Sequence, residues 1–183
     1  MNKSEILATE IESKKIELLQ DRIDNNSKLI NDLTNKLVAD YCKQLDKYVK
    51  YIQEVLNDTE HPATAEELDD MVMQLPVLLY FCGEAQENLG IKNDVAKAVK
   101  QEKYNEIYNE LQKGTISDKT SKAELAVQSE EVTRIIYDRA YKIVKEKMNA
   151  AYELLSSIKK VISRRMSEYE LGGVDSGRFK GRT

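Results

Sequence analysis

The chain has 183 residues with 28 basic and 32 acidic side chains, 41% hydrophobic and 7% aromatic residues, and only seven glycines and two prolines. The longest apolar run, LPVLLYFC at 75–82, is much shorter than the roughly 20 residues of a membrane span. The N-terminal MNKSEILATEIESKK has no apolar core of a signal peptide. These features argue against a membrane span and secretion. We expect a cytoplasmic protein made of long helices, in the host cytoplasm if a phage encodes it.

Residues 1–57 are predicted to form a long N-terminal helix. Apolar side chains recur there every three or four residues, as at Leu45, Tyr48 and Ile52, which indicates one buried stripe. The polar segment DNNS at 24–27 consists of residue types that favour caps and turns, so we expect a break there.

Residues 64–114 are predicted to form a pair of helical segments after a loop, NDTEHPAT, at 57–64. Thr64 and Glu67 have the spacing of a capping box. Leu68, Met71, Val72 and Leu75 share the inner side of this helix. Pro76 removes one backbone N–H, so a kink is expected near it, and Gly90 suits a helix C-terminus.

Residues 117–171 are predicted to form a long basic C-terminal helix, with a second capping box at Ser121 and Glu124. Its apolar residues step by threes and fours, close to a heptad, so the helix must bury this seam against other helices or other subunits. The tail at 172–183 combines four glycines with three cations and is expected to be flexible. The predicted oligomer seam consists of Ile136, Ile143, Leu154, Ile158 and Val161.

The fold class that follows is all-α: an elongated antiparallel helical bundle or coiled coil with a long C-terminal helix, expected to be oligomeric. Cys42 and Cys82 lie in apolar stretches and are expected to be buried thiols in a reducing compartment. His61 is the single histidine, and no glycine-rich phosphate loop is present. We therefore expect no enzyme, no catalytic residues, no metal site and no cofactor.

Charge is distributed unevenly along the chain. Residues 139–183 hold eleven basic and five acidic side chains, a net +6, while the other 138 residues hold 17 and 27, a net −10. Lys160 and Arg164 share one helix face, and a row of cations of this kind can bind nucleic-acid phosphates. The phenylalanine in GRFKGRT could stack on an unpaired base. The predicted nucleic-acid-binding residues are Lys159, Lys160, Arg164, Arg165, Arg178, Lys180 and Arg182.

The order of features over residues 91–170 adds a resemblance. A turn with Gly and Thr (KGTIS, 113–117) leads into an AEL helix, and a long helix punctuated by tyrosine and alanine ends in SSIKKVISRR. This layout resembles the UvsY family, the recombination mediators of T4-like phages. The resemblance implies an oligomeric, all-helical protein that binds single-stranded DNA. It also implies that the protein helps to load a RecA-like recombinase onto strands covered by single-strand-binding protein.

Two other interpretations stay open at this point. The chain could be a helical scaffold, or an interaction protein that binds or inhibits a protein partner without nucleic acid, with its basic end complementing an acidic surface. A basic helix lying on an anionic membrane fits less well, because the positions flanking the cations lack bulky aromatic residues. The leading interpretation is a non-enzymatic, phage-type accessory protein of DNA recombination or replication with no membrane partner.

Overall fold

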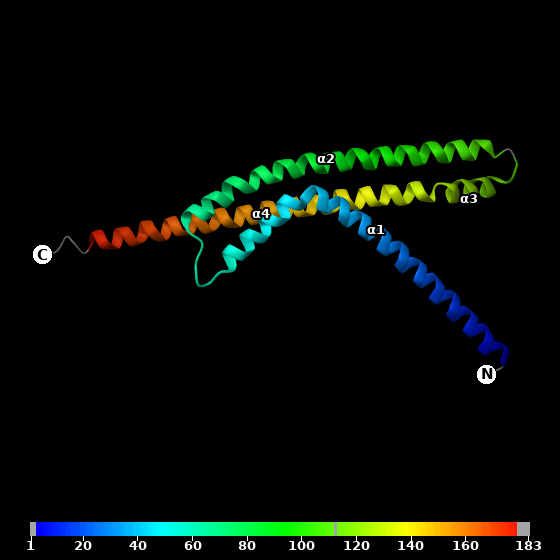
Figure 1. The fold of residues 1–183 in the computed structure, drawn as a ribbon, viewed down its shortest axis with the longest axis horizontal. Coiled ribbons are helices and arrows are strands. Elements are labelled where there is room, and N and C mark those ends of the chain that lie inside the picture. Colours follow the sequence, from blue (N-terminus) through cyan, green and yellow to red (C-terminus); the bar gives the residue numbers. More distant parts are fainter. Residues whose placement is uncertain (1–2, 112, 179–183) are drawn as a thin grey trace. The chain divides into compact units, whose positions relative to one another are not determined.

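The computed structural model describes the backbone of residues 3–111 and 113–178, and the side-chain surroundings of residues 14–111 and 113–170. This part of the chain forms four helices and no strand (Figure 1). Helix α1 spans Lys3–Asn57, α2 Ala65–Glu110, α3 Ile116–Ala126 and α4 Gln128–Arg178. The prediction of an all-α helical bundle is confirmed, as is that of a long C-terminal helix, because α4 has 51 residues.

The helices contribute to two compact units. The first unit comprises Met1–Leu37 and Leu89–Ala140, and the second comprises Val38–Asn88 and Tyr141–Thr183. Three of the four helices therefore supply residues to both units, so each unit is built from segments that are distant in the sequence.

The second unit has an apolar core where α1, α2 and α4 meet. Its fully or almost fully buried residues repeat every three or four positions, as the predicted helical stripes require. The predicted inner residues Leu68, Met71 and Leu75 are all buried, and Val72 is half-buried. The largest side chains of this core that are at most 2% exposed are Leu45, Ile52, Leu68, Met71, Leu75, Leu79 and Ile158.

The first unit depends more on polar contacts. Lys100 and Lys103 of α2 form ion pairs with Glu131 and Glu130 of α4, at 2.9 and 2.6 Å between nitrogen and oxygen. Arg134 donates two further hydrogen bonds of 2.9 Å to Glu131. Because Glu131 accepts hydrogen bonds from Arg134 and Lys100, its pKa falls to about 2.

The helix starts show one correct and one wrong capping prediction. The Thr64 backbone N–H donates to Glu67 at 2.8 Å, and the Glu67 N–H donates to the Thr64 hydroxyl at 3.2 Å, which confirms the first capping box. The second capping box is formed by Thr115 and Asp118, not by Ser121 and Glu124. Thr115 follows Gly114, whose φ of +125° is accessible mainly to glycine, so the chain turns before α3.

Several predicted boundaries differ from the observed ones. Helix α1 continues through 24–27, where all four side chains are exposed, because Asp, Asn and Ser cost a helix only about half a kcal/mol each. In place of a helical pair over 64–114, α2 is one helix that continues past Pro76 and Gly90. The long helix predicted over 117–171 is interrupted at Val127, which separates α3 from α4. Helix α4 extends to Arg178, into the predicted tail.

Candidate nucleic-acid interface

The strongest concentration of positive charge lies on α4 after its last buried residue. Ile158 is 1% exposed, and of the following residues up to Glu170 only Ile162 is half-buried while the others are exposed. The segment 156–166, SSIKKVISRRM, holds four cations and no acidic residue. This end of α4 therefore presents its cations to solvent without local neutralisation from within the segment.

Lys159 and Lys160 are the first two cations of this segment. Both are exposed, and within the part of the chain that the structure describes their ammonium groups have neither an ion pair nor a hydrogen bond. Lys160 and Arg164 are four residues apart and thus lie about 6 Å apart along the same helix face. These side chains can approach an anion without first losing a protein partner.

Arg164 has a partner that is easily displaced. Its Nε donates to Glu168 Oε1 at 2.8 Å, and the two side chains are 81% and 59% exposed. Exposed ion pairs of this i,i+4 type contribute little to stability, because water screens the two charges. A phosphate can therefore replace the Glu168 carboxylate at little cost.

Arg165 has a different position. Its Nη1 donates to the backbone carbonyl of Ala63 at 2.5 Å, in the loop before α2. This contact joins α4 to the connection between α1 and α2 within the second unit. The two residues are 102 positions apart, so no local sequence pattern indicated the contact. Arg165 is therefore a structural residue at least in part.

The three predicted tail cations cannot be placed in the site. Arg178 is the last residue of α4, and its side chain lies outside the described residues, as do Lys180 and Arg182 entirely. One aromatic residue that was not among the predicted site residues follows the four cations of segment 156–166. Tyr169, one turn after Arg165, is 85% exposed and could stack on an unpaired base.

The predicted oligomer seam lies mostly within the chain's own packing. Ile158 is buried in the second unit, Ile143 and Leu154 are half-buried there, and Ile136 is half-buried in the first unit. Val161 is 38% exposed. The face that α4 actually buries is displaced by one residue along part of its length, so that Val144 and Leu155 are buried where Ile143 and Leu154 were predicted. Its buried residues are Ala140, Val144, Met148, Ala151, Leu155 and Ile158.

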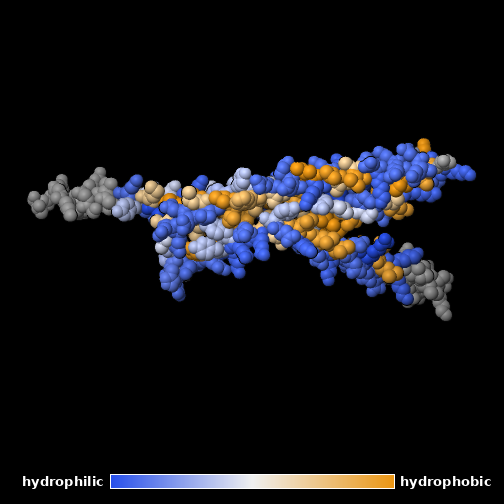
Figure 2. Space-filling view, turned by 45° about the horizontal axis from the view of Figure 1, so that its top comes forward, coloured by the Kyte–Doolittle hydropathy of each residue, from blue (hydrophilic) through white to orange (hydrophobic). Residues whose placement is uncertain are grey.

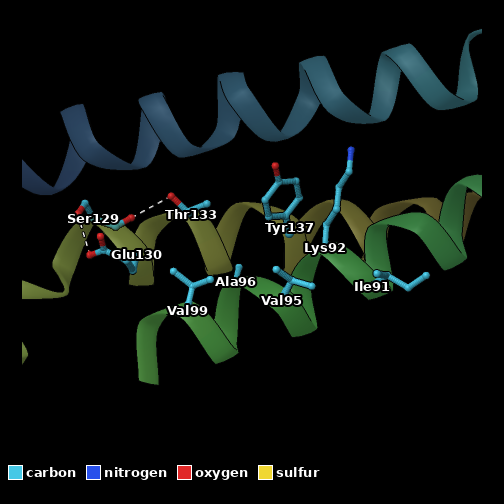
Figure 3. Close-up of a pocket in the computed structure, with 9 residues that line it drawn as sticks. All are labelled: Ile91, Lys92, Val95, Ala96, Val99, Ser129, Glu130, Thr133 and Tyr137. Atoms are coloured by element: carbon cyan, nitrogen blue, oxygen red, sulfur yellow. Dashed lines mark hydrogen bonds between the residues drawn. The ribbon is translucent and has the colours of Figure 1, made fainter. Parts of the chain in front are cut away.

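The first unit contains a second candidate site, an apolar groove of about 430 Å³ between α2 and α4 (Figure 3). Ile91, Val95 and Val99 form one side of this groove and are 47–56% exposed. Lys92 and Tyr137 extend next to each other, with the Lys92 nitrogen 5.9 Å from the ring centroid. The remaining lining residues are Ala96, Ser129, Glu130 and Thr133. Helix α2 has apolar residues on two faces. Sequence reasoning predicted only the inner face around Leu68 and Met71, and it therefore missed the groove.

Apolar side chains are also exposed on the N-terminal part of α1. Ile16, Leu19 and Ile23 are 56–58% exposed, at a spacing of three and four residues that places them on one face. In Figure 2, apolar surface in orange covers part of this segment and part of the second half of α2. Both segments belong to the first unit, which thus exposes apolar side chains on α1 and on α2.

Among the described residues, no group of three or more His, Cys, Asp or Glu side chains could hold a metal ion. None of the helices, as far as their residues are described, combines the length and apolar character needed to cross a bilayer. Comparisons of this chain with protein-family models, curated proteins and solved structures find no match.

Proposed function

We propose that this chain is a non-enzymatic accessory protein of DNA recombination or replication that binds single-stranded DNA through the exposed end of α4. The observation that carries the proposal is the segment 156–166, in which the exposed Lys159 and Lys160 and the weakly paired Arg164 occur without an acidic residue. The acidic remainder of the chain repels a polyanion, so DNA is held at this end.

Binding at this site is driven by the release of counterions from the DNA. For a single strand, the slope of log K against log salt is about −0.7 per neutralised phosphate. Three cations therefore give a slope of about −2, which corresponds to a roughly 20-fold loss of affinity between 50 and 200 mM salt. Stacking of a base on Tyr169 would favour a single strand over a duplex, whose bases are already stacked.

The place of this activity in recombination rests on the resemblance of residues 91–170 to the phage mediators. In that role the protein acts in the cytoplasm of the host cell as an oligomer. It would bring single-stranded DNA together with a RecA-like recombinase and a single-strand-binding protein. Faster assembly of such a recombinase on a coated strand in the presence of this protein supports the role, and an unchanged rate contradicts it.

The DNA-binding proposal is tested by fluorescence anisotropy with a labelled single strand of about 30 nucleotides and the matching duplex. The variant replaces Lys159, Lys160 and Arg164 by alanine. A control replaces three exposed lysines of α1, Lys36, Lys43 and Lys47, by alanine, which changes the net charge equally. The first variant should lose the salt slope of about −2, and the control should retain it. Equal effects of both variants, or no binding by the unmodified chain at 50 mM salt, would contradict the proposal.

A second candidate function, a self-assembling interaction protein, has its own observation in the apolar groove. The occupant that fits best is the α1 segment of a second copy, because Ile16, Leu19 and Ile23 form an exposed apolar face over about two helical turns, the same length as the row of Ile91, Val95 and Val99 along the groove. Sedimentation of the unmodified chain and of Val95→Glu distinguishes the cases. A defined oligomer that the substitution dissociates supports this function, and a monomer at all concentrations contradicts it.

A further inference from the structure

The two cysteines of the chain face each other across the α1–α2 contact of the second unit. Cys42 of α1 is 0% exposed and Cys82 of α2 is 3% exposed. The two thiols form a hydrogen bond with each other. The chain contains no other cysteine, so every intramolecular disulfide that it can form joins these two residues.

The contact between α1 and α2 is within the reach of a disulfide bond. Packed helices have axes about 8–10 Å apart, and their Cα atoms lie about 2.3 Å from each axis. Two residues that point directly at each other thus have Cα atoms roughly 3.5–5.5 Å apart, and a disulfide spans about 4.4–6.8 Å. Since the thiols are already in hydrogen-bond contact, closing the bond requires little backbone movement.

The surroundings make the two sulfurs unequal. Cys42 donates its S–H to Cys82, which raises the pKa of Cys42 and lowers the pKa of Cys82. Lys147 of α4, ion-paired with Asp46 of α1, lies close enough to lower the pKa of Cys82 further, while burial and Asp46 oppose this. The thiolate is the reactive form of cysteine. Cys82 is also the less completely buried residue of the pair, at 3% against 0% exposed, so we assign it as the sulfur that reacts first.

We propose that Cys42 and Cys82 form an oxidation site at which a peroxide generates an intramolecular disulfide between α1 and α2. The Cys82 thiolate attacks one peroxide oxygen, the O–O bond breaks, and the departing hydroxide takes up a proton to become water, leaving a sulfenic acid on Cys82. The Cys42 sulfur then attacks the Cys82 sulfur. The S–S bond forms, the S–O bond breaks, and the oxygen leaves with the Cys42 proton as a second water. In sum, two thiols and hydrogen peroxide give one disulfide and two waters.

The bond would hold together the two helices that flank the 58–64 loop. It closes a segment of 40 residues, which removes freedom mainly from the unfolded chain. In the chain-entropy description, a loop of this length favours the folded state by roughly several hundred-fold. The oxidised second unit should therefore be more resistant to unfolding than the reduced one, and a thiol reductant should reverse the difference.

The first experiment measures the effective concentration of one thiol toward the other in glutathione redox buffers. It is carried out on the folded full-length chain and on the same chain unfolded in guanidinium. Blocking of free thiols followed by mass measurement gives the fraction of disulfide. By linkage, the ratio of the two values equals the factor by which the disulfide stabilises the fold. A ratio above about ten supports the proposal. A lower ratio overturns it, because the fold would then not hold the pair ready for bonding.

The second experiment treats the folded chain with hydrogen peroxide. We expect a loss of two hydrogen masses, a non-reducing peptide map that joins the Cys42 and Cys82 peptides, and a thermal midpoint that rises and returns to its original value after reduction. Cys42→Ser should accumulate a sulfenic acid on Cys82 that dimedone captures, because its partner sulfur is absent. Two free thiols after a treatment that oxidises the unfolded chain, or cross-links only between chains, would overturn the proposal.

Discussion

The ion-pair cluster around Glu131 should make the first unit's stability depend on pH. The Glu131 carboxylate pairs with Lys100 at 2.9 Å and with Arg134 at 2.9 Å, and its pKa falls from 4.5 to about 2. At 1.36 kcal/mol per pKa unit this corresponds to at most about 3.4 kcal/mol. Because the Glu131 side chain is 32% exposed, solvent screening reduces the contribution to about 1–2 kcal/mol.

The sign of the effect follows from the depressed pKa of Glu131. Its stabilising contribution is complete above the pKa of the unfolded chain, near 4.5, and is lost as the pH falls from there through about 2. Glu131→Gln should therefore lower the free energy of unfolding by about 1–2 kcal/mol at pH 7. Its difference from the unmodified chain should disappear near pH 2.

Urea denaturation followed by circular dichroism at pH 7 and at two lower pH values measures this difference. Glu106→Gln is the matched control, because it makes the same charge change at an exposed position of α2 in the same unit. The control should have the stability of the unmodified chain within about 0.5 kcal/mol. If Glu131→Gln has no effect at pH 7, or an effect that persists unchanged near pH 2, the assignment of stabilising ion pairs to Glu131 is wrong.

Three further pairs of substitutions test other parts of the structure. Thr115→Ala should destabilise the start of α3 by about 0.5–2 kcal/mol while Thr115→Ser should not, because serine keeps the capping hydroxyl; amide exchange in α3 measures both. Leu79→Ala should lower the free energy of unfolding by about 2–5 kcal/mol, because Leu79 is only 1% exposed. Val77→Ala should lower it by less than about 0.5 kcal/mol, because Val77 is 50% exposed. Thermal unfolding measures both changes. Arg165→Ala should lower the free energy of unfolding by about 1 kcal/mol, because it removes the hydrogen bond to Ala63. Lys160→Ala should leave the stability unchanged and should weaken DNA binding more than Arg165→Ala does. Equal binding losses would show that Arg165 is not mainly structural.

Much of the architecture follows from local rules that a sequence displays. Helix is favoured along almost the whole chain because breakers are few, and the Thr64–Glu67 capping box is a local pattern of residues three positions apart. The inner face of α2 around Leu68 and Met71 follows from helical periodicity. The exposed cations at 159–164 follow from composition, since charged side chains remain in water unless a partner compensates for their burial.

Tertiary structure decided what depends on distant residues. The contact of Arg165 with Ala63 and the pairing of Cys42 with Cys82 join positions 102 and 40 residues apart. A sequence indicates which side chains are apolar or charged, because these are properties of single residues. Which of two apolar faces of α2 is buried depends on the helices that pack against it, so only the assembled structure determines it.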